Sequence, residues 1–246
     1  MAKNKLEKFA EMANFANVVQ PAELMAQNFE YKGKWSNDFF HNNNPITLEL
    51  GCGKGEYTVA LSQAYPERNF IGVDIKGARI WKGAKQALED NITNAGFLRT
   101  RIDMIDNFFG AGEVSEIWIT FADPQPKKQN KRLTSAYFLN LYRKFMKQGA
   151  VINLKTDSRL LHFYTLELLK ANHIEPIFHT DDLYGSPLPD ENLGIKTFYE
   201  NMFLQEGKKI TYLKFILDIN KEIVEIPKFE QSQKTNQSDH MEHSLV

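Results

Sequence analysis

The residues best suited to chemistry begin in a glycine-rich segment, Leu48-Glu49-Leu50-Gly51-Cys52-Gly53-Lys54-Gly55. Glycines at alternate positions permit a tight turn and allow a ligand to approach the backbone closely. A nucleotide-bearing ligand bound at such a turn lies near the N-terminus of the helix that follows it. A plain strand-to-helix turn has the same composition, so this segment alone leaves both interpretations open.

Two aspartates follow this segment at places typical of a nucleotide site. Asp74 ends the second predicted strand, where doubly wound sheets place an acid that binds ribose hydroxyls. Asp103 ends the third predicted strand, where an acid can meet the adenine edge of a cofactor. Each also has a simpler interpretation, namely a surface carboxylate for Asp74 and a turn-forming residue for Asp103.

The charge of Glu49 separates two classes of nucleotide cofactor. Dinucleotide enzymes typically carry G-x-G-x-x-G, whereas this chain has G-x-G-x-G preceded by Glu49, a variant that resembles class I S-adenosylmethionine-dependent methyltransferases. S-adenosylmethionine carries an ammonium and a sulfonium near this position, whereas NAD carries a pyrophosphate. At about 4 Å and an effective dielectric constant of about 20, one pair of unit charges is worth on the order of 4 kcal/mol, favourable with a cation and unfavourable with a phosphate. The loop therefore favours S-adenosylmethionine.

A second informative segment is Phe121-Ala122-Asp123-Pro124-Gln125-Pro126-Lys127-Lys128-Gln129-Asn130-Lys131-Arg132. Proline restricts the residue before it to extended geometry, so Asp123 is expected at the carboxyl end of the fourth strand, the edge where α/β sheets bind ligands. Four cations within six residues follow it. They fit a strip that docks phosphates, with a salt slope of roughly three to four if all four neutralise phosphates. A solvated surface run of charge is the alternative.

Alternating strands and helices are predicted around these segments. Short apolar and β-branched runs predict strands at 46–50, 70–74, 97–102, 116–121, 150–154 and 210–219. Apolar residues at helical spacing predict helices over 57–64, 77–88, 133–146 and 161–168. Gly149 is interpreted as the stop signal after the third of these helices. Strands that alternate with helices imply right-handed crossovers and a mostly parallel sheet.

The composition excludes several classes of protein. The 246 residues have a formal net charge of −1, which excludes a chain-wide basic field of the histone kind but allows a local basic patch. A single cysteine excludes an internal disulfide and a multi-cysteine zinc site, and the histidines lack metal-ligand spacing. No apolar run approaches about 18 residues, and the N-terminus lacks a signal-peptide core. We therefore expect a cytoplasmic protein that binds neither a membrane nor a metal.

With these segments in view, the chain resembles the bacterial tRNA (guanine-N7)-methyltransferase family from about Pro45 to Phe215. The resemblance rests on the glycine-rich segment, Phe70–Asp74, Asp123-Pro124 with the lysines after it, and two later motifs, Lys155-Thr156-Asp157 and Thr197-Phe198-Tyr199-Glu200. It implies a single Rossmann-like α/β class I methyltransferase domain at 45–225, with a mostly parallel seven-stranded sheet and helices on both faces. Residues 1–44 would form an N-terminal extension, and the polar residues 226–246 a disordered tail.

The resemblance also implies a reaction and the residues that serve it. A methyl group would pass from S-adenosylmethionine to N7 of a guanosine in the variable loop of tRNA, with Asp123 as the catalytic-site acid. The residues implied for the cofactor are Glu49, Gly51, Gly53, Gly55, Asp74, Asp103 and Asp123. Those implied for the guanosine or its backbone are Lys127, Asp157, Thr197, Phe198, Tyr199 and Glu200. Those implied to lie against RNA are Lys128, Gln129, Asn130, Lys131, Arg132, Leu133 and Thr134.

The chain departs from the family pattern beside Asp123. The family commonly has Pro-Asp-Pro-Trp, whereas this chain has Ala-Asp-Pro-Gln at 122–125, and the strip that follows is usually richer in His and Arg. Without the family, two motifs also have plainer interpretations: Asp157 with Ser158 can cap the helix that follows, and residues 197–200 can form a strand or loop edge.

Three other functions remain as alternatives, and the sequence leaves the oligomeric state open. A class I methyltransferase can act on another RNA base, a protein or a small molecule, although the basic strip argues against the last. An NAD(P)-dependent oxidoreductase would require a different glycine spacing. A non-catalytic nucleic-acid-binding module would have no need of Asp123.

Overall fold

The computed structural model describes residues 4–21, 29–185, 187–188 and 190–229. The strands are β1 (Val18–Val19), β2 (Ile46–Leu50), β3 (Asn69–Asp74), β4 (Ala95–Arg99), β5 (Val114–Thr120), β6 (Met146–Thr156), β7 (Phe178–Thr180) and β8 (Thr211–Ile216). The α-helices are α1 (Lys5–Met12), α2 (Glu56–Ala64), α3 (Gly77–Glu89), α4 (Ala136–Tyr142), α5 (Arg159–Ala171) and α6 (Phe198–Gln205). Short π or 3₁₀ turns form η2 (Trp35–Phe39), η3 (Ile102–Asn107), η4 (Gln129–Lys131) and η5 (Glu191–Gly194). Within the described ranges, no helix combines the length and the apolar character needed to cross a membrane.

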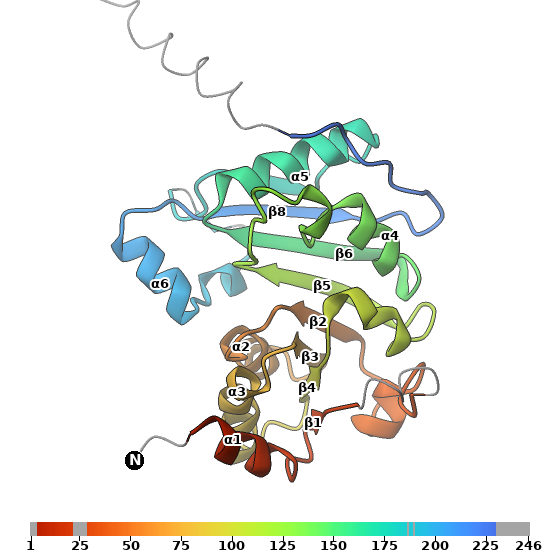
Figure 1. Cartoon of the computed structure of the whole chain (residues 1–246), viewed down its shortest axis with the longest axis vertical. Coiled ribbons are helices and arrows are strands. Elements are labelled where there is room, and N and C mark those ends of the chain that lie inside the picture. Colours follow the sequence, from red (N-terminus) through yellow and green to blue (C-terminus); the bar gives the residue numbers. More distant parts are fainter. Residues whose placement is uncertain (1–3, 22–28, 186, 189, 230–246) are drawn as a thin grey trace, which may run out of the picture.

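The strands form one sheet in the order β1-β4-β3-β2-β5-β6-β8-β7 (Figure 1). Neighbours from β1 through β6 run parallel, whereas β8 is antiparallel to both β6 and β7. This topology confirms the predicted α/β fold with a mostly parallel sheet. It has eight strands rather than seven because Val18 and Val19, from the N-terminal extension, pair with Phe97 and Leu98 of β4.

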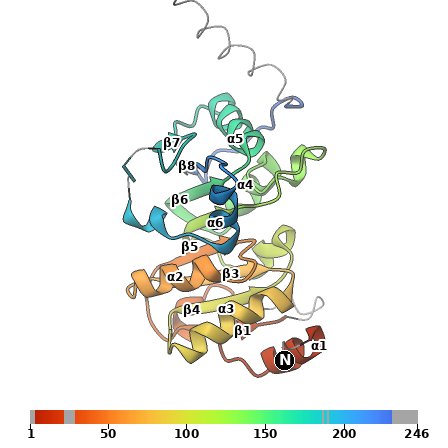
Figure 2. The ribbon, with the colours of Figure 1, turned by 90° about the vertical axis from the view of Figure 1, so that its left-hand side faces the viewer.

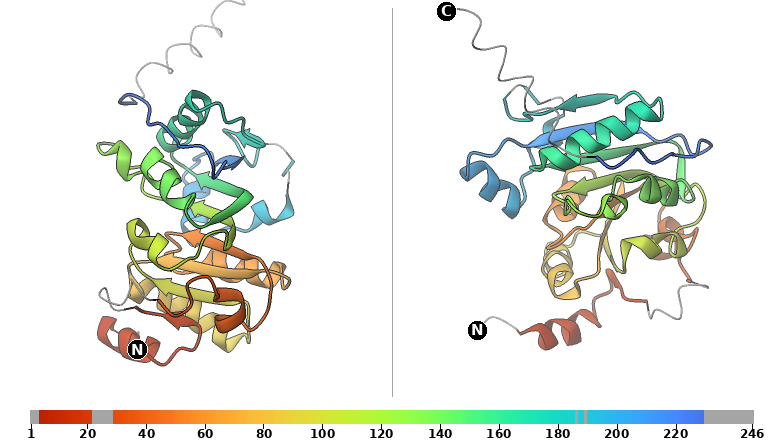
Figure 3. Two further views of the ribbon diagram at one scale, coloured as in Figure 1. Left: turned by 90° about the vertical axis from the view of Figure 1, so that its right-hand side faces the viewer. Right: turned by 45° about the horizontal axis from the view of Figure 1, so that its top comes forward.

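Helices cover both faces of the sheet, as predicted. Figure 2 views the face on which α2, α3 and α6 lie, and the left-hand view of Figure 3 shows the opposite side with α4 and α5. All five residues of β2 are buried, which is typical of a parallel strand covered on both faces. Leu48 of β2 belongs to the same hydrophobic cluster as Leu139 of α4 and Leu161 of α5, so the larger part of the core lies on their side.

The helix predicted over 133–146 is shorter in the structure. Ser135 caps α4 by accepting a hydrogen bond from the amide of Phe138, and Met146 already belongs to β6. Gly149 does not stop a helix but lies inside β6 with a φ of 77°, where the pairing of β5 with β6 shifts register. A glycine in the left-handed region allows the strand to bulge there. Gly149 therefore does mark an interruption of regular structure, but inside a strand and not at the end of a helix.

The folded chain continues past the predicted domain boundary at residue 225. The side-chain amide of Gln129 donates to the carbonyl of Ile226 at 2.9 Å, and its oxygen accepts from the amide of Phe229 at 2.8 Å. The ring of Phe229 also lies against Tyr164, with centroids 6.1 Å apart. Residues 226–229 of the predicted tail are therefore packed on the domain, and the rest of that prediction lies outside the described residues.

Candidate active site

An open cavity of about 490 Å³ lies where the glycine-rich loop joins β2 to α2. It is the carboxyl-end edge of the parallel strands, where α/β proteins bind ligands. Its walls come from the loop, from the ends of β2 and β5, from α2 and α3, and from the start of α6. The lining residues are Glu49, Gly51, Cys52, Gly53, Lys54, Glu56, Arg79, Thr120, Phe121, Thr197 and Tyr199.

The loop requires its glycines for two reasons. Gly51, Gly53 and Gly55 have φ values of 79°, 55° and 71°, which side-chain-bearing residues rarely adopt. Gly55 is also closely packed, since a Cβ there would lie 2.5 Å from the ring of Phe97 and 3.2 Å from the Cα of Gly83. The first two glycines line the cavity, whereas Gly55 begins α2 and packs the loop against α3.

Glu49 presents a buried carboxylate to this cavity. One oxygen accepts from the backbone amide of Thr58 at 2.9 Å and from its hydroxyl, and the other accepts from the hydroxyl of Thr120 at 2.7 Å. These donors are neutral, and burial raises the pKa of Glu49 to about 7, with a smaller contribution from the charge of Asp74. A cation bound in the cavity would therefore favour the ionised form of Glu49.

Asp74 and Asp103 differ in their positions relative to the glycine-rich loop. Asp74 accepts from the amide of Gly53 at 3.0 Å and from the amide of Lys76 at 2.8 Å, so it holds the glycine-rich loop beside the cavity. Asp103 is not at the end of β4, because that strand stops at Arg99 and Asp103 lies in η3. Two hydrogen bonds from Arg101, at 2.6 and 2.9 Å, hold the pKa of Asp103 below its usual range.

A second cavity of about 420 Å³ lies on the Asp103 side. Its lining residues are Pro21, Ile75, Arg99, Thr100, Arg101, Met104 and Phe108. Asp103 itself lines neither this cavity nor the one that contains Glu49. The structure therefore groups Glu49 with the glycine-rich loop and Asp74, and places Asp103 apart from them.

Asp123 lies just outside the first cavity. It is exposed, and its carboxylate accepts from the amide of Gln125 at 2.9 Å. Phe121, two residues earlier, lines the cavity and has a φ of 50°, so the chain turns sharply at the end of β5. The guanidinium of Arg132 donates to the carbonyl of Pro124 at 3.1 Å and so holds the segment that follows Asp123. The Asp123 carboxylate is thus exposed to solvent, two residues beyond a residue that lines the cavity.

The basic strip divides into an exposed part and a buried part. Lys127, Lys128, Asn130 and Lys131 are exposed, as expected for contact with RNA. Arg132, in contrast, is only 1% exposed, so its predicted role as an RNA contact is wrong.

Arg132 and its neighbours in the sequence pack within the fold rather than at the surface. The Arg132 guanidinium lies 4.3 Å from the centroid of the Tyr164 ring. Thr134 is fully buried and shares a 2.7 Å hydrogen bond with Thr165, so its predicted RNA contact is also wrong. Leu133 packs against the hydrophobic core, and the Gln129 amide is occupied by the C-terminal segment. The reason is that Arg132 and Thr134 pack against α5, and that the following helix, α4, is hydrogen-bonded to Ile223 and Glu225 of the C-terminal segment.

The two late motifs, residues 155–157 and 197–200, differ in how they contribute to the cavity. Ser158, rather than Asp157, caps α5, which leaves the Asp157 carboxylate partly exposed and 3.8 Å from Lys208. Thr197 caps α6 and lines the cavity together with Tyr199.

The remaining residues of the second motif point in different directions. Phe198 is 55% exposed, with the Lys54 ammonium 4.2 Å from its ring centroid. Glu200 is fully buried and turned away from the cavity, so the predicted contact between its side chain and a guanosine is wrong for this arrangement.

Several residues that shape the cavity have no clear signal in the sequence. Thr58 and Thr120 hold Glu49, and Arg79 extends into the lining from α3. Register alone explains Thr120: Glu49 pairs with Trp118, and Thr120 points to the same face two residues later. Recognising it from sequence would have required knowing that β2 and β5 are neighbours.

The chain has close relatives of known name. Residues 43–213 match a family described as "Putative methyltransferase". A tRNA (guanine-N(7)-)-methyltransferase of Bacteroides fragilis (strain YCH46) is 53% identical over 219 residues, which are 88% of this chain and 87% of the relative. Proteins of the same name from Porphyromonas gingivalis (strain ATCC BAA-308 / W83) and Listeria monocytogenes serotype 4a (strain HCC23) are 51% and 32% identical over 83% and 89% of this chain, and 86% and 96% of their own lengths.

Solved structures agree with the fold at much lower sequence similarity. The 16S rRNA methyltransferase KamB superposes with a TM-score of 0.56 at 13% identity, covering 72% of this chain and 89% of that one. An antibiotic-related methyltransferase gives a TM-score of 0.53 at 14% identity over the same shares of the two chains. Taken with the glycine-rich loop and its carboxylates, these relationships establish that the chain belongs to the tRNA (guanine-N(7)-)-methyltransferase family.

Proposed function

We propose that this protein transfers a methyl group from S-adenosylmethionine to N7 of a guanosine in tRNA. The observation that carries the proposal is the 53% identity over 219 residues to a curated tRNA (guanine-N(7)-)-methyltransferase. The cavity supports it, because a glycine-rich loop and a buried carboxylate with neutral partners suit a cationic nucleoside cofactor better than a pyrophosphate.

The residues at the cavity fit this cofactor. Glu49 would face its cationic methionine part, and the backbone of Gly51 and Gly53 would allow close approach. Asp74 uses each carboxylate oxygen for one backbone amide, and a carboxylate has about four acceptor sites, so capacity remains for ribose hydroxyls. When bound, S-adenosylmethionine supplies a methyl carbon activated by its sulfonium.

The protein's main contribution is to position the reactants. Guanine N7 already has an in-plane lone pair, so no base is needed to create the nucleophile. Alignment of the two reactants can supply roughly 7–11 kcal/mol of the barrier. The purine becomes cationic as the bond forms, and the Asp123 carboxylate at the cavity rim would stabilise that charge or accept a hydrogen bond from the base.

The exposed lysines would hold the polyanion beside this rim. Lys127, Lys128 and Lys131 follow Asp123 on the same loop, and none of the three is buried. Phosphates bound there would place a nucleotide near Asp123, Thr197 and Tyr199. Because N7 is often engaged in folded RNA, we expect the target nucleotide to be exposed or extruded on binding.

The test is to incubate the full chain with S-adenosylmethionine and unmodified tRNA and to identify the modified nucleosides by mass spectrometry. We expect 7-methylguanosine, and calorimetry should show binding of S-adenosylhomocysteine but not of NAD. Another methylated nucleoside would favour a different base specificity. Binding of NAD would favour an oxidoreductase, and binding of both S-adenosylhomocysteine and tRNA without methyl transfer would favour a non-catalytic module.

A further inference from the structure

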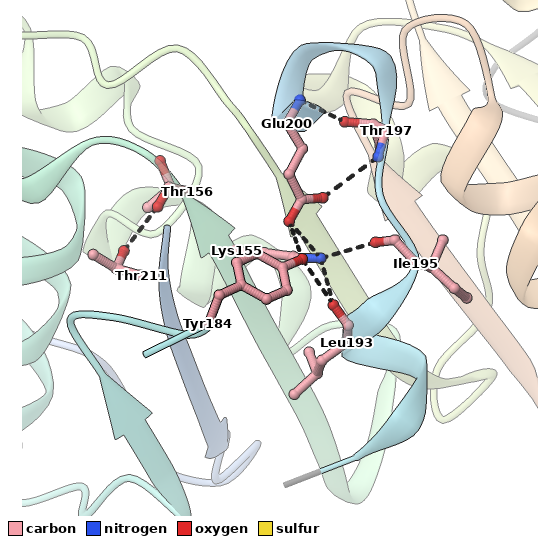
Figure 4. Close-up of polar contacts among 8 residues, drawn as sticks. All are labelled: Lys155, Thr156, Tyr184, Leu193, Ile195, Thr197, Glu200 and Thr211. Carbon is pink, nitrogen blue, oxygen red and sulfur yellow. Dashed lines mark hydrogen bonds and ion pairs between the residues drawn. The ribbon is translucent and has the colours of Figure 1, made fainter. Parts of the chain in front are cut away.

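A buried ion pair lies behind the wall of the cavity (Figure 4). The ammonium of Lys155 on β6 is 2.8 Å from the carboxylate of Glu200 on α6, and neither side chain is exposed. The same ammonium donates to the carbonyls of Leu193 and Ile195, each at 2.9 Å. A lysine ammonium has three donors, so Lys155 directs all of them to residues 193–200.

The carboxylate of Glu200 is equally occupied. Besides Lys155, it accepts from the hydroxyl of Tyr184 at 2.6 Å and, more weakly, from the amide of Thr197 at 3.4 Å. In return, the hydroxyl of Thr197 accepts from the amide of Glu200 at 3.2 Å, which completes the cap of α6. Glu200 therefore cannot reach a guanosine without first leaving its buried partners.

The pair connects α6 to the strand beside the cofactor cavity. Lys155 pairs in register with Thr120 of β5, whose hydroxyl binds Glu49. On the other side, the α6 segment held by Lys155 presents Thr197 and Tyr199 to the same cavity. A shift of residues 193–200 would therefore move one wall of the cavity relative to Glu49.

Stability alone does not account for such a pair. Removing two charges from water is costly, and replacing a buried ion pair with apolar residues is often neutral or stabilising. What the bonds of the pair do show is directional: they hold residues 193–200 in one arrangement relative to β6. Lys155 joins β6 to two backbone carbonyls and one side chain of a segment that begins 38 residues later in the sequence.

We propose that Lys155 and Glu200 are positioning residues for methyl transfer, which fix residues 193–200 so that Thr197 and Tyr199 form a wall of the cavity, and that Glu200 itself does not touch the guanosine. The reaction named here rests on the proposed function. The effect on cofactor binding does not require tRNA and can be tested separately.

The first test uses Lys155→Met, Glu200→Gln and the double variant of the full chain. The dissociation constant of S-adenosylhomocysteine is measured by calorimetry well below the melting temperature, together with KM and kcat on tRNA. We expect each single variant to weaken S-adenosylhomocysteine binding and raise the KM for tRNA, each by about tenfold, as for residues within one network. The double variant should be no worse than the more damaging single variant, because all three break the same pair.

A direct contact between Glu200 and guanosine predicts another pattern. Glu200→Gln would then impair only the kinetics with tRNA and leave the affinity for S-adenosylhomocysteine unchanged, and the effects of the two single substitutions would add. That result would overturn the proposal. A lower melting temperature with unchanged affinity for S-adenosylhomocysteine in every variant would also overturn it, since the pair would then only stabilise the fold.

Tyr184→Phe keeps the test decisive if Lys155→Met does not fold. It retains both charges and changes a residue that does not line the cavity, and it removes the hydroxyl that bonds Glu200 at 2.6 Å and the carbonyl of Leu193 at 3.1 Å. We expect a smaller loss of affinity for S-adenosylhomocysteine, about threefold, in the same direction; no loss would contradict the proposal. Lys144→Met, which breaks an exposed ion pair with Asp106, is the control and should match wild type. Absence of 7-methylguanosine with wild-type protein would refute the proposed function and leave the binding test intact.

Discussion

At the scale of single residues, the protonation of Glu49 determines how the cavity responds to charge. Burial raises its pKa to about 7, so below that pH the free protein holds Glu49 largely protonated. The ammonium that S-adenosylhomocysteine shares with S-adenosylmethionine favours the carboxylate when it lies near Glu49, so binding at pH 6 should release a proton. We expect the affinity for S-adenosylhomocysteine to fall as the pH decreases below about 7. Calorimetry in buffers of different ionisation enthalpy measures the proton released; no release in wild type, or an equal release in Glu49→Gln, would refute this role.

Substitution of Asp123 is expected to have the largest effect on the rate of methyl transfer. Because it is exposed and accepts only one described hydrogen bond, Asp123→Ala should leave stability within about 0.5 kcal/mol. We expect kcat to fall by about 100-fold or more, as when a charge-stabilising group is removed. Asp218→Ala is a matched control, since exposed Asp218 makes the same kind of bond, to the amide of Asn220 at 2.9 Å. Near wild-type turnover of Asp123→Ala would remove it from catalysis.

The exposed lysines and the buried arginine of the strip should respond differently to substitution. Replacing Lys127, Lys128 and Lys131 with Ala should lower the slope of log affinity against log salt by about two to three, because each contact with phosphate contributes roughly 0.7–0.9. Arg132→Ala should instead destabilise the fold by about 2 kcal/mol, since it removes a buried side chain packed on Tyr164. Filter binding at several salt concentrations and chemical denaturation distinguish these effects. A reduced slope with unchanged stability in Arg132→Ala would contradict the structure.

At the scale of elements, the contact between α3 and the glycine-rich loop sets the shape of the cavity. A Cβ at Gly83 would lie 2.6 Å from the carbonyl oxygen of Lys54 and 2.9 Å from the Cα of Gly55. Gly→Ala inside a helix normally stabilises by about 1 kcal/mol. Here we expect the opposite sign, a loss of about 1–3 kcal/mol with weaker S-adenosylhomocysteine binding, because both contacted atoms are backbone. Denaturation of Gly83→Ala beside Gln86→Ala, an exposed position on the same helix, gives the comparison; stabilisation by Gly83→Ala would refute it.

Elements with strong local signals were predictable and those defined by distant contacts were not. The run at 46–50 coincides with β2, and the apolar spacing around Ile80 predicted α3 almost to its ends. In contrast, Val18 and Val19 are too few to show a period, and they form a strand only because β4 offers an edge. The burial of Arg132 likewise depends on α5 and the C-terminal segment, which no local pattern around residue 132 could indicate.

The site was predictable to the same extent as its elements. Glu49, at the end of β2, and Gly51 and Gly53, in the loop after it, lie on one continuous segment, so their types and spacing sufficed to place them in the cavity. Glu200 was assigned to the substrate because its motif was read alone. Its partner, Lys155, is 45 residues away in the other late motif, and only the packing of α6 on β6 reveals that the two motifs form one ion pair.

At the scale of the whole molecule, the sheet order brings the functional segments together. Because β2 lies between β3 and β5, the glycine-rich loop, Asp74 and the Asp123 loop emerge at one edge of the sheet. Helix α6 comes just before the antiparallel strand β8 and lies at this edge, where its first residues complete the cavity. The arrangement thus combines a cavity that holds the buried carboxylate of Glu49, suited to a cationic methyl donor, with an adjacent loop of exposed lysines.

The most direct measurement is to locate the transferred methyl group on unmodified tRNA. After reaction with S-adenosylmethionine, reduction and aniline treatment break the RNA chain only at 7-methylguanosine. We expect one strong cleavage in the variable loop with wild-type protein and, at the same early reaction time, about one hundredth of that cleavage or less with Asp123→Ala. Incorporation of a labelled methyl group without cleavage would show that the acceptor is not guanine N7 and would contradict the central claim.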